Sequence, residues 1–247
     1  MSIQQAFADV ARADGRAALI TAVRGPHSGE RMLVRAGGEV DGSLGDADLD
    51  ALAVAHAEEL IWAEQSQLRG DLFVDVTAPA PRLLIFGAVE HANHLSHLAR
   101  VTGWRPYVID PRAAFATPER FPYAVEVLVA WPAKALEQLG GLDRATFIAV
   151  LTHDPKIDDE VLKLALAAEP AYIGAMGSKR AQESRRERLL ADGVAESELT
   201  RISAPVGLDL GALSSEEVAL SIMAEVVAVR YGRDGGRLSE RRGGAIH

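Results

Sequence analysis

From residue 82 onward, short runs of apolar residues alternate with longer stretches in which apolar residues recur every three or four positions. The apolar runs predict strands at 83–86, 106–109, 125–129, 147–151 and 172–173, and the periodic stretches predict helices at 91–102, 133–139, 155–168 and 179–191. Strands that are apolar throughout and separated by helices are typical of a parallel sheet covered on both faces. This part of the chain therefore predicts an α/β, Rossmann-like, doubly wound sheet. A last helix is expected at 215–230, with Ser214 as its N-cap.

The first part of the chain predicts a smaller α+β domain. Strands are expected at 17–23, 32–34, 39–44 and 72–76, a helix at 46–64, and a short helical stripe at Phe7, Val10 and Ala11. Gly37 and Gly38 suit a hairpin turn. The segment Ala78-Pro79-Ala80-Pro81 favours an extended backbone and predicts a linker. The predicted organisation is a domain at 1–77, a linker at 78–81, a Rossmann-like domain at 82–236 and a flexible tail at 237–247.

Composition narrows the classes of function. A chain of 247 residues with 48% hydrophobic residues and a mean hydropathy of +0.04 is typical of a globular protein. Its net charge of −9 argues against sequence-independent binding of nucleic acid. Its apolar runs are far shorter than the roughly 20 residues of a membrane span, and the start MSIQQAFADV lacks a secretory pattern, so we expect a cytoplasmic protein. With no cysteine, the chain has no thiolate ligand for a metal.

The turn after the first strand of the second domain departs from the dinucleotide fingerprint Gly-x-Gly-x-x-Gly/Ala. Gly87 and Ala92 match, but Val89 stands where the second glycine allows pyrophosphate to approach. Glu90 adds a negative charge at the helix start. We therefore expect that NAD and NADP do not bind here in their usual pose. Asp110 follows the next strand, where an acid would bind ribose; a turn residue is the equal alternative.

Ligands of open parallel sheets collect beyond the carboxyl ends of the strands, which makes the later loops informative. After the fourth predicted strand come Thr152, His153 and Asp154. Asp154 precedes Pro155 and is better explained as a helix N-cap, whereas the imidazole of His153 is expected to point into the crevice and can donate, accept or titrate.

The loop after the fifth predicted strand places two cations at a helix start, where the helix dipole disfavours them. A bound anion would resolve that conflict, and so would solvation together with pairing of Lys179 to Glu183. We favour the anion. The candidate residues of this loop are Gly174, Gly177, Ser178, Lys179 and Arg180.

Three histidines suggest a metal site that their spacing does not support. His91, His94 and His97 spread around a helix, since three residues advance about 300°. We expect no metal here. The chain also lacks the nucleophile-elbow, Walker and His-Glu-x-x-His motifs, and no catalytic residue is predicted.

Taken together, these segments resemble one known family. They are LLIFGA at 83–88, VIDPR at 108–112, FATPERFP at 115–122, VLTHDPKIDD at 150–159, YIGAMGSKR at 172–180 and PVGLDLGALSSEEVALSIMAEVVAVRYGRDGG at 205–236. They resemble the xanthine dehydrogenase accessory proteins of the XdhC/CoxI family. The stretch at 18–50 looks like a shortened version of that family's first domain, with Gly45-Asp46-Ala47-Asp48 in place of a Ser-Gly-Gly-Cys motif and a Cys-Gly-Gly motif deleted.

The resemblance implies a cytoplasmic, dimeric, non-enzymatic factor. Such a factor binds molybdenum cofactor, protects it during sulfuration and delivers it to a molybdenum hydroxylase subunit; the pterin phosphate is the anion that it implies. The implied crevice includes Asp209 beside the loop residues named above. Three alternatives stay open: an NAD(P)-dependent oxidoreductase, a regulatory nucleotide-sensing module, and a paralogue that only binds a partner.

Overall fold

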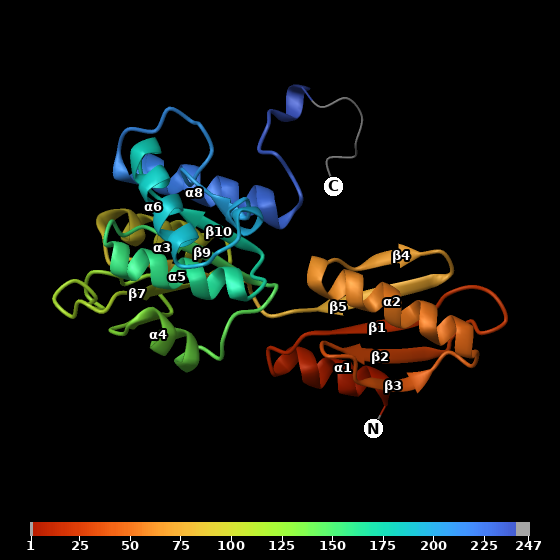
Figure 1. Cartoon of the computed structure of the whole chain (residues 1–247). Helices are drawn as coiled ribbons and strands as arrows, with labels where there is room; N and C mark the ends of the chain where they lie inside the picture. Colours follow the sequence, from red (N-terminus) through yellow and green to blue (C-terminus); the bar gives the residue numbers. More distant parts are fainter. Residues whose placement is uncertain (1, 241–247) are drawn as a thin grey trace. The chain divides into compact units, whose positions relative to one another are not determined.

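The computed structural model describes residues 2–240, and in it the chain divides into two compact units, one of residues 1–80 and one that begins at Pro81 (Figure 1). The division falls within the proline-containing segment at 78–81. No helix in the described part of the chain is long and apolar enough to cross a membrane.

The first unit is an antiparallel sheet with one helix on each face. Its strands are β1 (Ala17–Ala22), β2 (Arg31–Arg35), β3 (Val40–Ser43), β4 (Gln67–Arg69) and β5 (Leu72–Thr77), in the order β3-β2-β1-β5-β4. Its helices are α1 (Ile3–Arg12) and α2 (Ala47–Ala63). Alternate residues of β1 face opposite sides, so that Ile20 packs under α2 and Ala17 under α1. Asp46 caps α2 by accepting from the N–H of Leu49.

The second unit contains a six-stranded sheet in which every neighbouring pair is parallel. Its strands are β6 (Arg82–Phe86), β7 (Arg105–Ile109), β8 (Glu126–Leu128), β9 (Thr146–Val150), β10 (Tyr172–Ala175) and β11 (Ile202–Ser203), in the order β11-β10-β9-β6-β7-β8. The order reverses between β6 and β9. This reversal is the topological switch point, where ligands of such sheets bind.

Helices cover both faces of this sheet, so the predicted α/β, doubly wound class is confirmed (Figure 1). The helices of the unit are α3 (Glu90–Val101), α4 (Pro132–Gln138), α5 (Pro155–Ala167), α6 (Lys179–Ala191), α7 (Glu196–Leu199) and α8 (Ser215–Arg230). α3 and α8 pack on one face, while α4, α5 and α6 pack on the other. Successive residues of β6 show why, because Leu83 and Ile85 join the first cluster and Leu84 and Phe86 join the second.

Three short elements were not predicted: β4, α7 and β11. They have two to four residues each and carry no apolar run or helical period long enough to read. Leu238–Glu240 forms a single 3-10 turn, and the rest of the predicted tail, residues 241–247, lies outside the described residues.

Candidate ligand-binding edge of the parallel sheet

At the switch point, the loops after β6 and β9 touch. Gly87 has a φ of +115°, and a Cβ placed on it would lie 2.9 Å from both the Cγ2 and the backbone nitrogen of Thr152. Its N–H donates to Ile109 O across the neighbouring strand. Glycine is needed here because the Thr152 loop occupies the space in which a side chain would stand. The crevice between β6 and β9 is therefore closed at its base by protein.

Asp110 connects the loops after β6 and β7. Its side chain is fully buried, and its Oδ2 accepts from the N–H of Ala88 at 2.8 Å. Arg112 donates to it from the backbone N–H, from Nε and from Nη2, at 2.7–2.9 Å. Burial alone would raise the pKa of Asp110, but these hydrogen bonds and the charge of Arg112 outweigh burial and lower it. The ionised carboxylate of Asp110 thus holds the backbone of Ala88 and Arg112 together, and its binding of ribose stays a prediction.

The side chain of Val89 lies elsewhere than expected. It is half-buried and packs against the core cluster formed by α3, α8 and the sheet, instead of projecting into the space above the turn. The steric argument against a pyrophosphate is therefore wrong in this detail. Glu90 is exposed in the first turn of α3, as expected, where a carboxylate is favoured by the helix dipole.

A buried polar network joins the loop after β9 to helix α6. The hydroxyl of Thr152 donates to Asp158 at 2.9 Å and accepts from the N–H of Asp154 at 2.8 Å. Asp158 in turn accepts from Arg185 Nη2 at 3.1 Å, and both side chains of this pair are about 95% buried. Burial raises the pKa of Asp158, while the bonds from Thr152 and Arg185 oppose that rise.

The same network reaches the loop after β10. Arg185 also donates to Met176 O at 2.9 Å and to the side-chain oxygen of Gln182, whose amide donates to Gly177 O at 3.1 Å. The sequence did not indicate Arg185 or Gln182, because a cation on the polar helix α6 reads as a surface charge. Asp158 was not indicated either, because an acid in the first turn of a helix is explained by the helix dipole alone.

The start of α6 carries the predicted cations. Ser178 caps the helix by accepting from the N–H of Ala181 at 3.3 Å, and the first turn contains no acid. Lys179 and Arg180 are exposed, and no described residue forms an ion pair with either. Glu183, the expected partner of Lys179, lies 3.4 Å from Arg186. Two unpaired cations therefore lie beside the loops after β9 and β10, which the buried network joins.

The remaining predicted residues occupy different surroundings. His153 is exposed next to Thr152, and Asp154 caps α5 by accepting from the N–H of Lys156 at 3.0 Å. Gly174 was expected in the loop, but it lies inside β10, where a Cβ would come within 2.6 Å of Tyr172 and Val206. Asp209 is exposed in the loop before α8.

Two of the three histidines of α3 have identified neighbours. His97 stacks on Tyr123 with 4.0 Å between ring centroids, and His94 Nε2 lies 3.5 Å from Glu216. Among residues 2–240, no three His, Cys, Asp or Glu side chains come together in a way that could hold a metal ion.

Comparison with known protein families gives two matches. The model of the XdhC Rossmann domain matches residues 83–226, and that of the XdhC and CoxI family matches residues 10–70.

Individual relatives agree with these matches. A Bacillus subtilis (strain 168) protein, named as a probable subunit of xanthine dehydrogenase, is 32% identical over 160 residues, which are 65% of this chain and 46% of the relative. The molybdenum cofactor insertion chaperone PaoD of Escherichia coli (strain K12) is 33% identical over 152 residues, 62% of this chain and 41% of that protein. A crystal structure from Bacillus halodurans, described as a xanthine dehydrogenase, superposes with a TM-score of 0.63 at 25% identity, covering 94% of this chain and 64% of that one. The chain spans less than half the length of the Bacillus subtilis and Escherichia coli relatives.

Proposed function

We propose that this chain, which belongs to the XdhC and CoxI family, serves the maturation of a molybdenum hydroxylase as a non-enzymatic factor. The observation that carries the proposal is the match of the XdhC Rossmann-domain model to residues 83–226, supported by a relative named as a molybdenum cofactor insertion chaperone. A cytoplasmic location, a homodimer and partnership with a hydroxylase subunit belong to the same proposal.

The residues at the sheet edge fit one part of molybdenum cofactor better than another. The pterin phosphate suits the start of α6, where backbone N–H groups and two unpaired cations face no first-turn acid. The metal has no such ligands, since the chain has no cysteine to supply a thiolate. We therefore assign phosphate binding to Ser178, Lys179 and Arg180, and we assign no residue to molybdenum.

The buried network gives this edge its rigidity. Arg185 holds Met176 O and Asp158 at once, so it fixes the loop that presents Ser178 relative to the loop that presents His153. An anion site works best when its donors are already in place, because a ligand then loses less free energy to ordering. In this proposal, Arg185 positions the site and does not touch the ligand.

The proposal is tested in the host by deleting the gene and measuring the molybdenum content and activity of the hydroxylase. We expect both to fall, and to stay low when the gene is restored with Lys179→Gln and Arg180→Gln together. The control, Lys134→Gln with Arg144→Gln, removes two exposed cations elsewhere and should restore both. Unchanged molybdenum content on deletion would exclude a maturation role. If the Lys179/Arg180 variant fully restored the molybdenum content and activity, phosphate binding at the start of α6 would be refuted.

NAD and NADP are still not expected to bind in their usual pose, now for electrostatic reasons. The Asp110 carboxylate already accepts four N–H donors, and Glu90 stands where the pyrophosphate would bind. Calorimetric titration with both nucleotides should show no binding at low micromolar concentration. Binding in that range that is lost in Asp110→Asn would favour an oxidoreductase.

A further inference from the structure

A groove with a volume of about 370 Å³ lies between α6 and the segment that holds α7 and β11. One wall is a face of α6, because Lys179, Glu183 and Arg186 recur at helical spacing. The other wall is largely apolar and includes Leu199, Ile202 and Pro205. Pockets of this size accept small organic molecules, and their few polar groups fix the orientation of the ligand.

One of the three cations that line the groove has no ion-pair partner among the described residues. Arg186 is neutralised by Glu196, which accepts from its Nε and Nη2 at 3.0 and 2.8 Å, and it also lies near Glu183. Arg185 is neutralised by Asp158. Lys179 is left, and within residues 2–240 it has no ion-pair partner. The groove thus offers one unpaired ammonium group at one end and an apolar wall along its length.

A second observation points to an acceptor on the ligand. The Nε of Arg185 is buried and has no hydrogen-bond partner among the residues that the structure describes. A buried donor without a partner is destabilising, and Arg185 contributes to the floor of the groove. An oxygen of a bound molecule, reached by a small shift of the guanidinium group, would satisfy this donor.

We propose that the groove between α6 and β11 binds a small organic anion, with its acidic group at Lys179 and its apolar body against Leu199, Ile202 and Pro205. The proposal does not depend on the maturation role. The groove shares Lys179 with the phosphate site at the start of α6, but its apolar wall is built by the chain segment after α6 and not by the loops that follow β6, β7 and β9.

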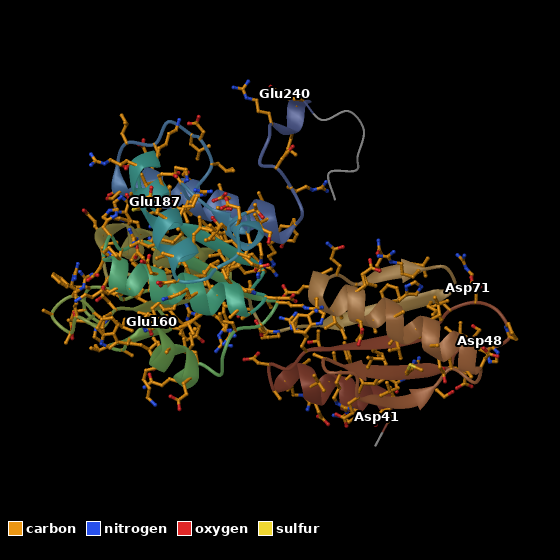
Figure 2. The ribbon with its side chains drawn as sticks, in the orientation of Figure 1. Asp41, Asp48, Asp71, Glu160, Glu187 and Glu240 are labelled. Carbon is orange, nitrogen blue, oxygen red and sulfur yellow. The ribbon has the colours of Figure 1, made fainter. Side chains whose placement is uncertain are left out.

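Two pairs of matched variants separate this groove from the rest of α6. Lys179 lines it, whereas its equally exposed neighbour Arg180 does not. Glu183 lines it, whereas Glu187, which projects from the same helix, does not (Figure 2). The pairs Lys179→Gln with Arg180→Gln, and Glu183→Trp with Glu187→Trp, therefore make the same chemical change inside and outside the groove.

The experiment titrates the purified full chain with anilinonaphthalene sulfonate, a fluorescent anion with an apolar body, without cofactor or hydroxylase. We expect saturable binding at one site, weakened about three- to fivefold by Lys179→Gln, as suits an exposed charge, and less than twofold by Arg180→Gln. Glu183→Trp should abolish binding by filling the groove, and Glu187→Trp should leave it intact. Circular dichroism checks that each variant is folded.

Three results would overturn the proposal. One is the absence of saturable binding, and another is equal binding by both members of each pair. The third is dissociation of an oligomer by Glu183→Trp with unchanged dye binding, which would mean that a second copy covers the groove. Lys179→Gln keeps the test decisive if the tryptophan variant does not fold, because it alters only an exposed side chain. None of these results bears on the molybdenum content of a hydroxylase, so the two proposals fail separately.

Discussion

Replacing Gly87 by alanine tests whether the switch point is closed as the structure shows. The new Cβ would stand 2.9 Å from two atoms of Thr152, and the backbone would have to keep a φ of +115°. Gly103 provides the matched control, because it lies in the same unit at a φ of +83° with no atom within 4 Å of its Cβ position. The Gly103→Ala variant thus measures the cost of backbone strain without the contact.

The expected magnitudes follow from these two contributions. Backbone strain at a positive φ should lower the free energy of unfolding by about 1–3 kcal/mol in both variants. Crowding against Thr152 should lower it by a further 1–3 kcal/mol or so in Gly87→Ala alone. Since a domain is stable by about 5–15 kcal/mol, the variant should fold and remain measurable.

The assay is urea unfolding followed by tryptophan fluorescence. The chain has three tryptophans, and a Trp62→Phe background leaves Trp104 and Trp131, both in the second unit. Trp104 is 3% exposed and meets Phe147 edge to face, so its emission should change when the core opens. Restricting the signal to one unit avoids combining two transitions in one curve.

A second substitution identifies the contact. Thr152→Ser removes Cγ2 and keeps the hydroxyl that donates to Asp158, so in the Gly87→Ala background it should restore part of the loss. Restoration should be incomplete, because the backbone nitrogen of Thr152 stays in place. The reasoning is refuted if Gly87→Ala and Gly103→Ala differ by less than about 0.5 kcal/mol, a difference within the usual error of such comparisons.

Three further changes address the polar contacts. Arg185→Met leaves Asp158 buried without its cation and should lower the free energy of unfolding by about 3–5 kcal/mol; adding Asp158→Asn should recover more than about 1 kcal/mol in urea unfolding, and simple additivity would contradict the pairing. Asp110→Asn should be most destabilising near neutral pH. The lowered pKa of Asp110 means that its carboxylate stabilises the fold at pH values above the ordinary pKa of 3.8, and this stabilisation is lost as the pH falls through the pKa of the folded state. A cost in unfolding free energy that does not change with pH would contradict this sign. Ser178→Ala should cost about 1 kcal/mol by removing the N-cap of α6, and an unchanged unfolding midpoint would show that the cap contributes nothing.

The fold could be predicted largely because its core strands are apolar throughout. The strand β9 is buried at all five positions, and such a run between two helical periods indicates a central parallel strand. The helix caps follow from the sequence as well, since Asp154, Ser178 and Ser214 each accept from a backbone N–H in the first turn of the helix that follows. By contrast, β11 pairs through only two residues, and its place at the edge of the sheet depends on tertiary contacts.

The sequence predicted residues of the candidate site only where their role depends on neighbours in the sequence. Lys179 and Arg180 stand at a helix start that the sequence predicts, where the helix dipole disfavours cations. Asp158 and Arg185 are 27 residues apart, and their pairing results from the packing of α5 beside α6. Nothing in the periodicity of α6 marks Arg185 as buried, because that helix has five cations and two carboxylates and almost no apolar stripe.

Closure of the switch point explains why the glycine pattern and the proposed ligand diverge. A pyrophosphate fingerprint needs glycines so that a ligand can approach, whereas here Gly87 lets Thr152 approach and Val89 packs into the core. The base of the crevice is thus filled by protein atoms. The hydroxyl of Thr152 then begins the chain of hydrogen bonds that runs through Asp158 and Arg185 to the loop before α6. These hydrogen bonds hold the loop from which α6 begins, and an anion at this edge of the sheet is therefore expected at the start of α6, away from the Gly87 turn.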